Sequence, residues 1–238
     1  MKIRLDQHLA QKGLVTTRSQ AESYIKLGKV KVNGHVIAKP GFLVDATADI
    51  NLTSMEQYVS RAALKLASVT EAFRLDFYDK VVLDVGSSTG GFTDYALRHG
   101  AKKVIAVEVG TDQLHPSLRG NPKIELHEKT DIRNFTTSVV IDLVVADVSF
   151  ISLREILPSV AKLCSKQTRI VAMVKPQFEA AQDSLKHKGV IKNDKMRRDI
   201  LKSFEAWSQD YFRIEAKADS AVQGAKGNQE RFYLLHKA

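Results

Sequence analysis

The chain has 238 residues, 44% of them hydrophobic, which suffices for one large domain or a medium domain with a small one and excludes extensive disorder. No apolar stretch is long enough to cross a bilayer, and the N-terminus lacks the apolar core of a signal peptide, so we expect a cytoplasmic protein without a membrane partner. The single cysteine, Cys164, excludes an internal disulfide, and no metal site is expected. The net charge of +9 favours an anionic partner, and residues 1–44 carry most of it, with eight Lys or Arg against two acidic residues.

Residues 1–53 are predicted to form a small α+β module. Two short helices are expected, the second with Thr17 as its N-cap and Gly28 as its stop. Residues 30–36 alternate around an Asn-Gly pair, which is the strongest signal for a short hairpin. Residues 43–52 are expected to add further strand.

Four motifs of this module are Arg4-Leu5-Asp6, Thr17-Arg18, Gly28-Lys29-Val30 and Val32-Asn33-Gly34. With them the module resembles the S4-type RNA-binding domain. The resemblance implies that five basic side chains face RNA phosphates: Arg4, Arg18, Lys26, Lys29 and Lys31. Phosphate contacts are specified collectively, so an ordinary exposed charge is the alternative for any one of them.

A polar linker at 54–60 leads to a larger domain at 61–238. Strands are expected at 81–85, 103–107, 141–146, 169–174, 213–217 and 231–235, and helices at 92–99, 153–164 and 194–211. This alternation predicts an α/β, Rossmann-like domain with a mainly parallel sheet and helices on both faces. An apolar stripe on the last helix is expected to be core: Met196, Ile200, Phe204, Trp207 and Tyr211.

Residues 81–94 have the pattern of a buried strand that ends in a Gly-rich turn and opens a helix. Ser88 occupies the second glycine position of a dinucleotide turn, which disfavours NAD. An acid at a strand end followed by glycines is typical of S-adenosylmethionine sites. The residues expected to contact this cofactor are Asp84, Gly86, Ser87, Ser88, Thr89, Gly90, Gly91 and Phe92. A tight turn without a ligand is the alternative.

Four charged residues follow later strands. Glu108 comes directly after residues 104–107, where a carboxylate can accept both hydroxyls of a bound ribose. Asp131 is expected either to contact the adenine amine of the cofactor or to cap a helix. Asp147 and Lys175 end two further strands, so both should project into the crevice where open α/β sheets bind ligands.

Further motifs are Tyr58-Val59-Ser60-Arg61, Leu64-Lys65-Leu66, Asp147-Val148-Ser149-Phe150-Ile151-Ser152, Val174-Lys175-Pro176-Gln177-Phe178-Glu179 and Gly227-Asn228-x-Glu230. With them the whole chain resembles the TlyA family, which joins an S4-type module to an FtsJ-like methyltransferase domain. The resemblance implies a class I methyltransferase that methylates the ribose 2′-hydroxyl of cytidine in ribosomal RNA, with ribosomal RNA or a ribosomal subunit as its partner. It also implies a catalytic tetrad of Lys65, Asp147, Lys175 and Glu230. The family usually has Gly-Gly where this chain has Ala62-Ala63, which bears on the position of Lys65.

The tetrad has a chemical rationale. A ribose 2′-hydroxyl is a poor nucleophile until a base removes or holds its proton. Lys175 is the candidate base, because the like charge of Lys65 favours a neutral amine there. Asp147 and Glu230 favour charged lysines instead, so we expect the four groups to titrate as a unit.

Two other functions compete with this interpretation. A non-catalytic RNA- or ribosome-binding factor would use the methyltransferase domain as a scaffold, and loss of a tetrad residue would favour it; none is lost. A membrane-active hemolysin, a name that family members also carry, would need a long apolar or strongly amphipathic basic helix. We expect a monomer.

Overall fold

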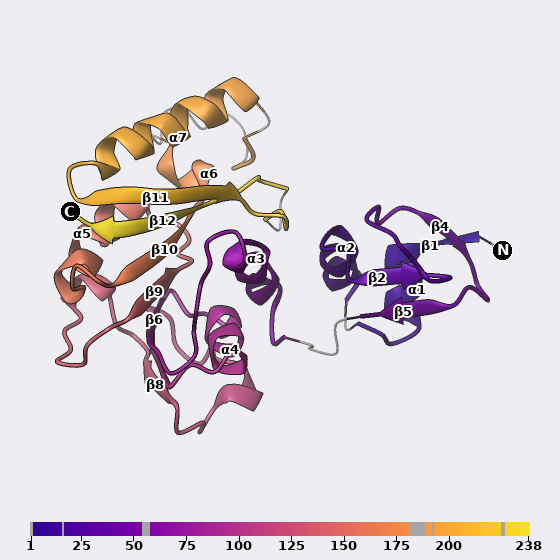
Figure 1. The fold of residues 1–238 in the computed structure, drawn as a ribbon, viewed down its shortest axis with the longest axis horizontal. Helices are drawn as coiled ribbons and strands as arrows, with labels where there is room; N and C mark the ends of the chain where they lie inside the picture. The colour runs from indigo at the N-terminus through magenta and orange to yellow at the C-terminus, as the bar shows by residue number, and fades with distance from the viewer. Residues whose placement is uncertain (1, 16, 54–57, 181–188, 192, 225–226) are drawn as a thin grey trace.

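The computed structural model describes residues 2–15, 17–53, 58–180, 189–191, 193–224 and 227–238. It contains a small N-terminal module and a larger α/β domain (Figure 1). Four residues of the predicted linker, 54–57, lie outside the described part of the chain. The last strand of the module ends at Leu52 and the first helix of the large domain begins at Arg61, but the domain boundaries at 53 and 60 stay predictions.

The N-terminal module is built from short elements: β1 (Lys2–Arg4), α1 (Leu5–Gln11), α2 (Arg18–Lys26), β2 (Val30–Val32), β3 (His35–Val36), β4 (Leu43–Asp45) and β5 (Ile50–Leu52). The side chain of Thr17 accepts a hydrogen bond from the backbone N–H of Gln20, as the capping pattern predicts. Asn33 and Gly34 both have positive φ, which is the geometry of the predicted hairpin turn. Residues 43–52 are divided between two sheets, because β4 pairs with β1 whereas β5 pairs with β2.

The large domain contains α3 (Arg61–Thr70), β6 (Val81–Val85), α4 (Gly91–Arg98), β7 (Lys103–Val107), η1 (Pro116–Leu118), β8 (Ile124–His127), η2 (Ile132–Asn134), β9 (Leu143–Ala146), α5 (Leu153–Leu163), β10 (Arg169–Val174), α6 (Pro176–Glu179), α7 (Asp194–Ser208), β11 (Phe212–Asp219) and β12 (Arg231–Lys237). The strand order in its sheet is β11-β12-β10-β9-β6-β7-β8. Strands β6 to β10 pair in parallel, and β12 runs antiparallel to β10 and β11. The predicted α/β fold with a mainly parallel sheet is confirmed.

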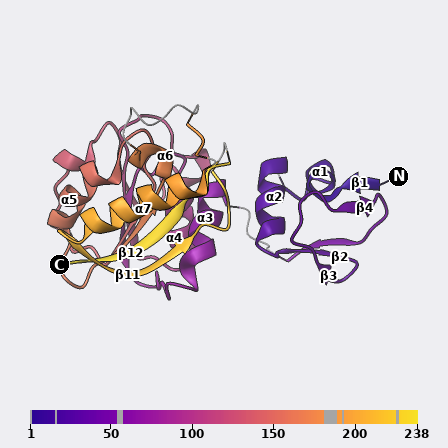
Figure 2. The same cartoon turned by 90° about the horizontal axis from the view of Figure 1, so that it is seen from above.

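Helices cover both faces of this sheet, so its central strands are continuous apolar runs. α3 and α4 pack on one face through residues such as Leu66 and Tyr95. α5 and α7 pack on the other through residues such as Leu157 and Phe204. Figure 2 shows α7 lying across the antiparallel strands β11 and β12.

The prediction for the last helix needs correction. α7 ends at Ser208, and Tyr211 comes after it with 41% of its surface exposed. Met196 and Trp207 are only half-buried, and the buried apolar residues of α7 are Leu201 and Phe204. Trp207 packs against the edge of this core, and Tyr211 lies beyond the end of the helix, so only part of the predicted stripe is core.

Candidate active site

The site lies at the carboxyl ends of the central strands. β7 and β8 continue from β6 towards one edge of the sheet, whereas β9 and β10 lie on its other side, so β6 and β9 flank a topological switch point. Val85 pairs with Ala146, which makes β6 and β9 end side by side. Gly86 follows with φ +79°, and a Cβ at this position would lie 2.9 Å from the carbonyl oxygen of Asp147. Only glycine fits here.

The Gly-rich turn also brings α3 against α4. Gly90 has φ +86° and precedes the first residue of α4. A Cβ on Gly91 would lie 2.8 Å from the Cβ of Ala62, at the N-terminal end of α3. Ala62 is therefore accommodated because its neighbour on α4 is a glycine. This contact places α3, and Lys65 on it, next to the turn.

Asp84 is a buried carboxyl group at the end of β6, with only 1% of its surface exposed. Its Oδ2 accepts a hydrogen bond of 2.6 Å from the hydroxyl of Thr93, and its Oδ1 has no partner among the described residues. Burial raises the pKa of Asp84 to about 7, against the effect of Thr93. The carboxyl lines a cavity of about 130 Å³ with the turn, so its unpaired oxygen is suited to a cationic ligand.

Replacing Asp84 by asparagine is expected to stabilise the protein above neutral pH. The raised pKa means that the folded state holds this proton more tightly than the unfolded chain, so the free energy of unfolding falls as pH rises from about 4 to about 7. We expect Asp84→Asn to raise the Tm at pH 8 on the order of 5 °C, with the difference vanishing below pH 4. Thermal denaturation against pH measures this, with Asp210→Asn, an exposed site, as control. Parallel Tm profiles for Asp84→Asn and the wild type would contradict it.

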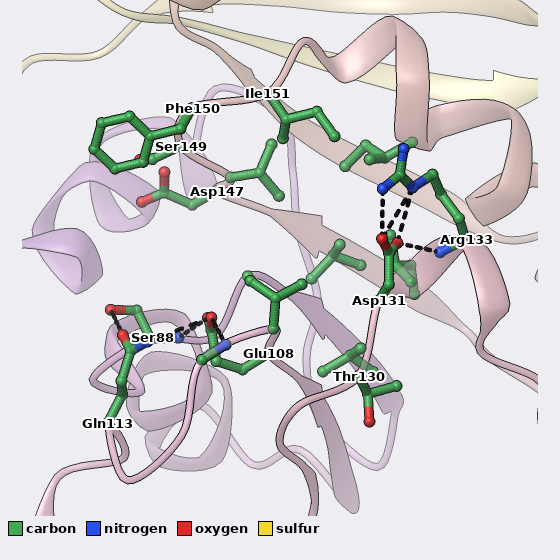
Figure 3. A pocket seen from close by; sticks show the side chains of 18 residues that line it. Ser88, Glu108, Gln113, Thr130, Asp131, Arg133, Asp147, Ser149, Phe150 and Ile151 are labelled. Atoms are coloured by element: carbon green, nitrogen blue, oxygen red, sulfur yellow. Dashed lines mark hydrogen bonds and ion pairs between the residues drawn. The ribbon is translucent and has the colours of Figure 1, made fainter.

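Glu108 follows β7 and lines a larger cavity of about 540 Å³ (Figure 3). Its two carboxylate oxygens accept hydrogen bonds from the backbone N–H groups of Ser88 (2.9 Å) and Gly110 (2.8 Å). These bonds hold the carboxylate against the Gly-rich turn. Each oxygen keeps a second lone pair, so Glu108 can still accept hydrogen bonds from a ligand.

Asp131 lines the same cavity but is occupied locally. Its carboxylate caps η2 by accepting from the backbone N–H of Arg133 (2.9 Å) and forms an ion pair of 2.6 Å with the Arg133 side chain. The helix-capping alternative describes this geometry. Its position on the cavity wall leaves the contact with an adenine amine as a prediction.

Lys175 and Asp147 form one half of the predicted tetrad. β9 and β10 are adjacent parallel strands, so the residues that follow them meet at the same edge. Lys175 Nζ lies 2.6 Å from Asp147 Oδ1 and donates a hydrogen bond of 2.7 Å to Ser149 Oγ. The ammonium group is thereby held by two oxygens on the loop after β9.

Lys65 and Glu230 form the other half. Lys65 is on α3, and Glu230 is the residue directly before β12. Lys65 Nζ lies 2.6 Å from Glu230 Oε2, and both side chains are buried. Burial raises the pKa of Glu230 above its ordinary value, although the charge of Lys65 opposes this shift. Lys65, Lys175 and Glu230 line one cavity of about 640 Å³, and Asp147 lines the smaller adjoining one with Lys175. The structure thus brings together four residues that are far apart in sequence.

Ser149, Phe150 and Phe178 also lie at this site, although the sequence analysis gave none of them a role of its own. Ser149 contacts Lys175, as described above. Phe150 has φ +68° and 92% of its surface exposed, and its ring centroid lies 5.3 Å from that of Phe178 at the mouth of the large cavity. The sequence signal for this role was a large aromatic residue in the loop that directly follows a central strand.

Glu179 connects the two loops that carry Asp147 and Lys175. Its carboxylate accepts hydrogen bonds from the hydroxyl of Ser152 (2.6 Å) and the backbone N–H of Leu153 (2.7 Å) at the start of α5. The end of the Lys175 motif is therefore tied to the end of the Asp147 motif. This explains why both motifs extend several residues beyond their charged members.

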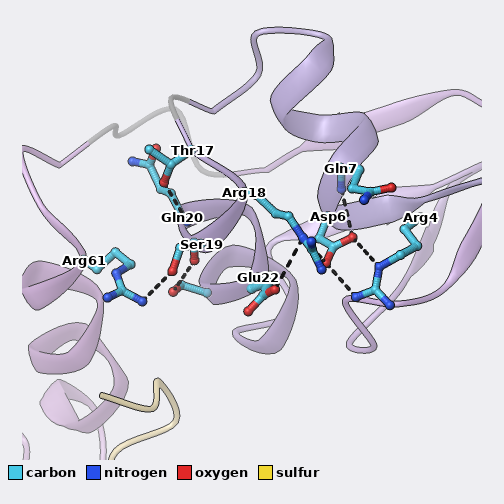
Figure 4. Close-up of polar contacts among 10 residues, drawn as sticks. Arg4, Asp6, Gln7, Thr17, Arg18, Ser19, Gln20, Glu22 and Arg61 are labelled. Carbon is cyan, nitrogen blue, oxygen red and sulfur yellow. Dashed lines mark hydrogen bonds and ion pairs between the residues drawn. The ribbon is translucent and has the colours of Figure 1, made fainter. Parts of the chain in front are cut away.

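Arg4 and Arg18, predicted to face RNA, converge on the carboxylate of Asp6 (Figure 4). Asp6 is fully buried, and the two guanidinium groups lie 2.8 and 3.0 Å from its Oδ2. Burial alone would raise the pKa of Asp6, but the hydrogen bonds from both arginines outweigh it and hold that pKa below its ordinary value. Both arginines stay about half-exposed, so they can still contact phosphate.

The three lysines of the predicted RNA surface lie at the end of α2 and at β2. Lys29 and Lys31 are exposed beside and on β2. Lys26, at the end of α2, lies 3.4 Å from the side-chain oxygen of Gln223 in the large domain. It therefore faces the junction of the two domains rather than the free side of the module.

Comparison with known proteins agrees with both halves of the structure. The S4 domain family matches residues 3–50, and the FtsJ-like methyltransferase family matches residues 58–237. The helices of the described residues include none long and apolar enough to span a membrane.

Related proteins match along most of the chain. The chain is 38% identical to the 16S/23S rRNA (cytidine-2′-O)-methyltransferase TlyA of Mycobacterium tuberculosis, over 98% of this chain and 90% of that one. It is 42% identical to the 23S rRNA (cytidine-2′-O)-methyltransferase TlyA of Campylobacter jejuni, over 76% and 72%. A solved structure of a protein named as a hemolysin, from Streptococcus thermophilus, superposes with a TM-score of 0.73 at 36% identity and covers 100% of this chain and 89% of its own. The chain therefore belongs to the TlyA family, in which an S4 domain precedes an FtsJ-like methyltransferase domain.

Proposed function

We propose that the protein methylates the ribose 2′-hydroxyl of a cytidine in ribosomal RNA, with S-adenosylmethionine as the methyl donor. The observation that carries this proposal is the presence of two ion pairs, the buried Lys65–Glu230 and the largely buried Lys175–Asp147, at cavities that adjoin the Gly-rich turn. Relatives named as rRNA (cytidine-2′-O)-methyltransferases support the substrate. The protein would act as a monomer in the cytoplasm on ribosomal RNA or a ribosomal subunit.

The residues around the turn suit this cofactor. The unpartnered Oδ1 of Asp84 suits the ammonium group of its methionine end, and Glu108 suits the two hydroxyls of its ribose. When bound, S-adenosylmethionine supplies a methyl group on a sulfonium centre, and the neutral thioether is a good leaving group. The small cavity at Asp84 and the larger one at Glu108 share Gly86, Ser88 and Asp147, so one elongated ligand can occupy both.

The tetrad would prepare the ribose oxygen for reaction. Two ammonium groups beside this oxygen stabilise the negative charge that develops as its proton leaves. Asp147 and Ser149 orient Lys175, and Glu230 orients Lys65, so both ammonium groups are in place before the substrate arrives. With both lysines charged, the leaving proton is accepted by a carboxylate of this network, and burial raises the pKa of Glu230, which suits it to this role.

The mouth of the site would hold the target base. A nucleotide whose ribose reaches a buried lysine has to leave its stack, and an aromatic face compensates part of that cost. Phe150, exposed and in contact with Phe178, offers such a face between the two large cavities.

Mapping of ribose methylation tests the proposal directly. Ribosomal RNA from cells with and without the protein is compared for alkali-resistant 2′-O-methylated positions. We expect a cytidine that is methylated only when the protein is present, and that purified protein with S-adenosylmethionine restores in vitro. Identical maps, with RNA binding retained, would favour the non-catalytic ribosome-binding factor instead.

A further inference from the structure

Arg61 is a cationic residue of the catalytic cavity that the tetrad does not use. It is the first residue of α3 and lies one helical turn before Lys65, hence on the same side of the helix. Both residues line the cavity of about 640 Å³. A positive charge thus lies next to the position proposed for the reacting ribose.

The guanidinium of Arg61 is held by the N-terminal module. Its Nη1 donates a hydrogen bond of 2.5 Å to the hydroxyl of Ser19 on α2 (Figure 4). Lys26 lies on α2, the helix that also carries Ser19. Among the described residues, no carboxylate lies within ion-pair distance of Arg61 or of Lys26. The guanidinium is half-buried, and its hydrogen-bond partner among the described residues is a neutral hydroxyl, so it retains donors for an anion.

Arg61 also lines a second, polar crevice of about 150 Å³ between α2 and the chain that precedes β12. The other walls are formed by Ser19, Ser23, Lys26, Gly224 and Gly227, with Val222 and Gln223 beside them. Glu22 is the one acidic residue among those lining it, and its carboxylate lies 3.7 Å from Arg18. Arg61 and Gly224 line both this crevice and the catalytic cavity, so the two adjoin.

The chemistry of RNA indicates what occupies this junction. The carbon that bears a 2′-hydroxyl is bonded to the carbon that bears the 3′-phosphate, so a phosphodiester always lies next to the reacting oxygen. A planar guanidinium binds phosphate oxygens through two parallel hydrogen bonds, and a lysine adds a second positive charge at such a site.

We infer that Arg61 and Lys26 bind a backbone phosphate next to the target ribose, at a site formed only where the two domains meet. Ser19 is a positioning residue in this site, because it orients Arg61 without contacting the RNA. The inference rests on the proposed function, since it takes RNA as the substrate. The N-terminal module would then help to position the target ribose, in addition to binding RNA away from the catalytic cavity.

The test combines RNA binding and kinetics in the full-length protein. Arg61→Gln removes the charge but keeps a planar amide. Lys166→Gln is the matched control, an exposed lysine before β10 at the opposite end of the sheet. Binding to unmodified ribosomal RNA transcribed in vitro is measured over a range of salt concentrations, and S-adenosylmethionine binding is measured calorimetrically.

We expect Arg61→Gln to weaken RNA binding roughly 10-fold and to lower the slope of log K against log salt by about 1, whereas Lys166→Gln changes neither. S-adenosylmethionine affinity should be unchanged in both. Ser19→Ala should leave the salt slope unchanged and lower kcat several-fold with little change in KM, and Ser19→Thr should restore kcat.

An unchanged salt slope for Arg61→Gln, or an equal drop for Lys166→Gln, would overturn the phosphate site. An unchanged kcat for Ser19→Ala would overturn its positioning role. The binding slopes do not depend on methyl transfer. A wild-type protein that methylates no ribosomal RNA would refute the proposed function while the slopes still decide on the phosphate site.

Discussion

Lys175→Ala should abolish methyl transfer, with a loss of turnover of about 10²- to 10⁴-fold, the range typical of a group that assists proton transfer. Lys175 is the residue with contacts to both Asp147 and Ser149, so its removal also releases the two oxygens that orient the network. Single-turnover methylation of unmodified ribosomal RNA measures the effect. S-adenosylmethionine binding should stay within a few-fold of the wild type, because the donors of the Gly-rich turn are untouched.

Two further variants show whether the loss of turnover is specific to the Lys175 amine. Lys195→Ala removes an exposed lysine of α7 and should keep full activity. Lys175→Arg keeps a charge beside Asp147 but not the position or proton affinity of the amine, so it should stay inactive. Turnover retained in Lys175→Ala would remove this residue from the catalytic role.

Removal of residues 1–53 should weaken binding to ribosomal RNA by about 100-fold or more at physiological salt. The deleted module carries the five basic residues predicted to face RNA phosphates, and binding that rests on several phosphate contacts falls steeply with salt. Binding measured at increasing salt should show a smaller slope for the truncated protein. An unchanged affinity would refute the role of the module in holding RNA.

The truncation has a structural side effect that needs its own control. Leu64 on α3 and Val222 before β12 are buried against the core of the N-terminal module. Deletion would expose both, next to Lys65 and close to Glu230 in sequence. The truncated protein should therefore also carry Leu64→Ser and Val222→Ser, to keep this surface polar. A full-length Lys29→Gln, Lys31→Gln variant measures the loss of charge alone.

Local features of the chain were predictable because their causes are local. The hairpin at residues 30–36 follows from Asn33-Gly34, since both residues adopt positive φ at little cost. The capping of α2 by Thr17 and the buried central strands follow in the same way from short patterns.

Pairing between distant segments was not predictable to the same degree. β1 has three residues and exists because Ile3 pairs with Val44 some 40 positions away. A strand this short carries no periodic signal of its own, and its stability comes from its partner. The convergence of Arg4 and Arg18 on the buried Asp6 is likewise a product of packing, because charged residues in a short motif do not reveal their shared partner.

The sequence by itself determined the class of fold, the two-part organisation, the family and the identity of the charged residues at the strand ends. These follow from periodicity, turn chemistry and motif spacing, which act over a few residues. Only the tertiary structure decided how those residues are paired: Lys65 with Glu230, Lys175 with Asp147 and Ser149, and Arg61 with Ser19 across the domain junction. Ion pairs and cavities depend on distances between elements that are far apart in the chain. Those distances are set by the order of strands in the sheet and by the packing of α2 against α3.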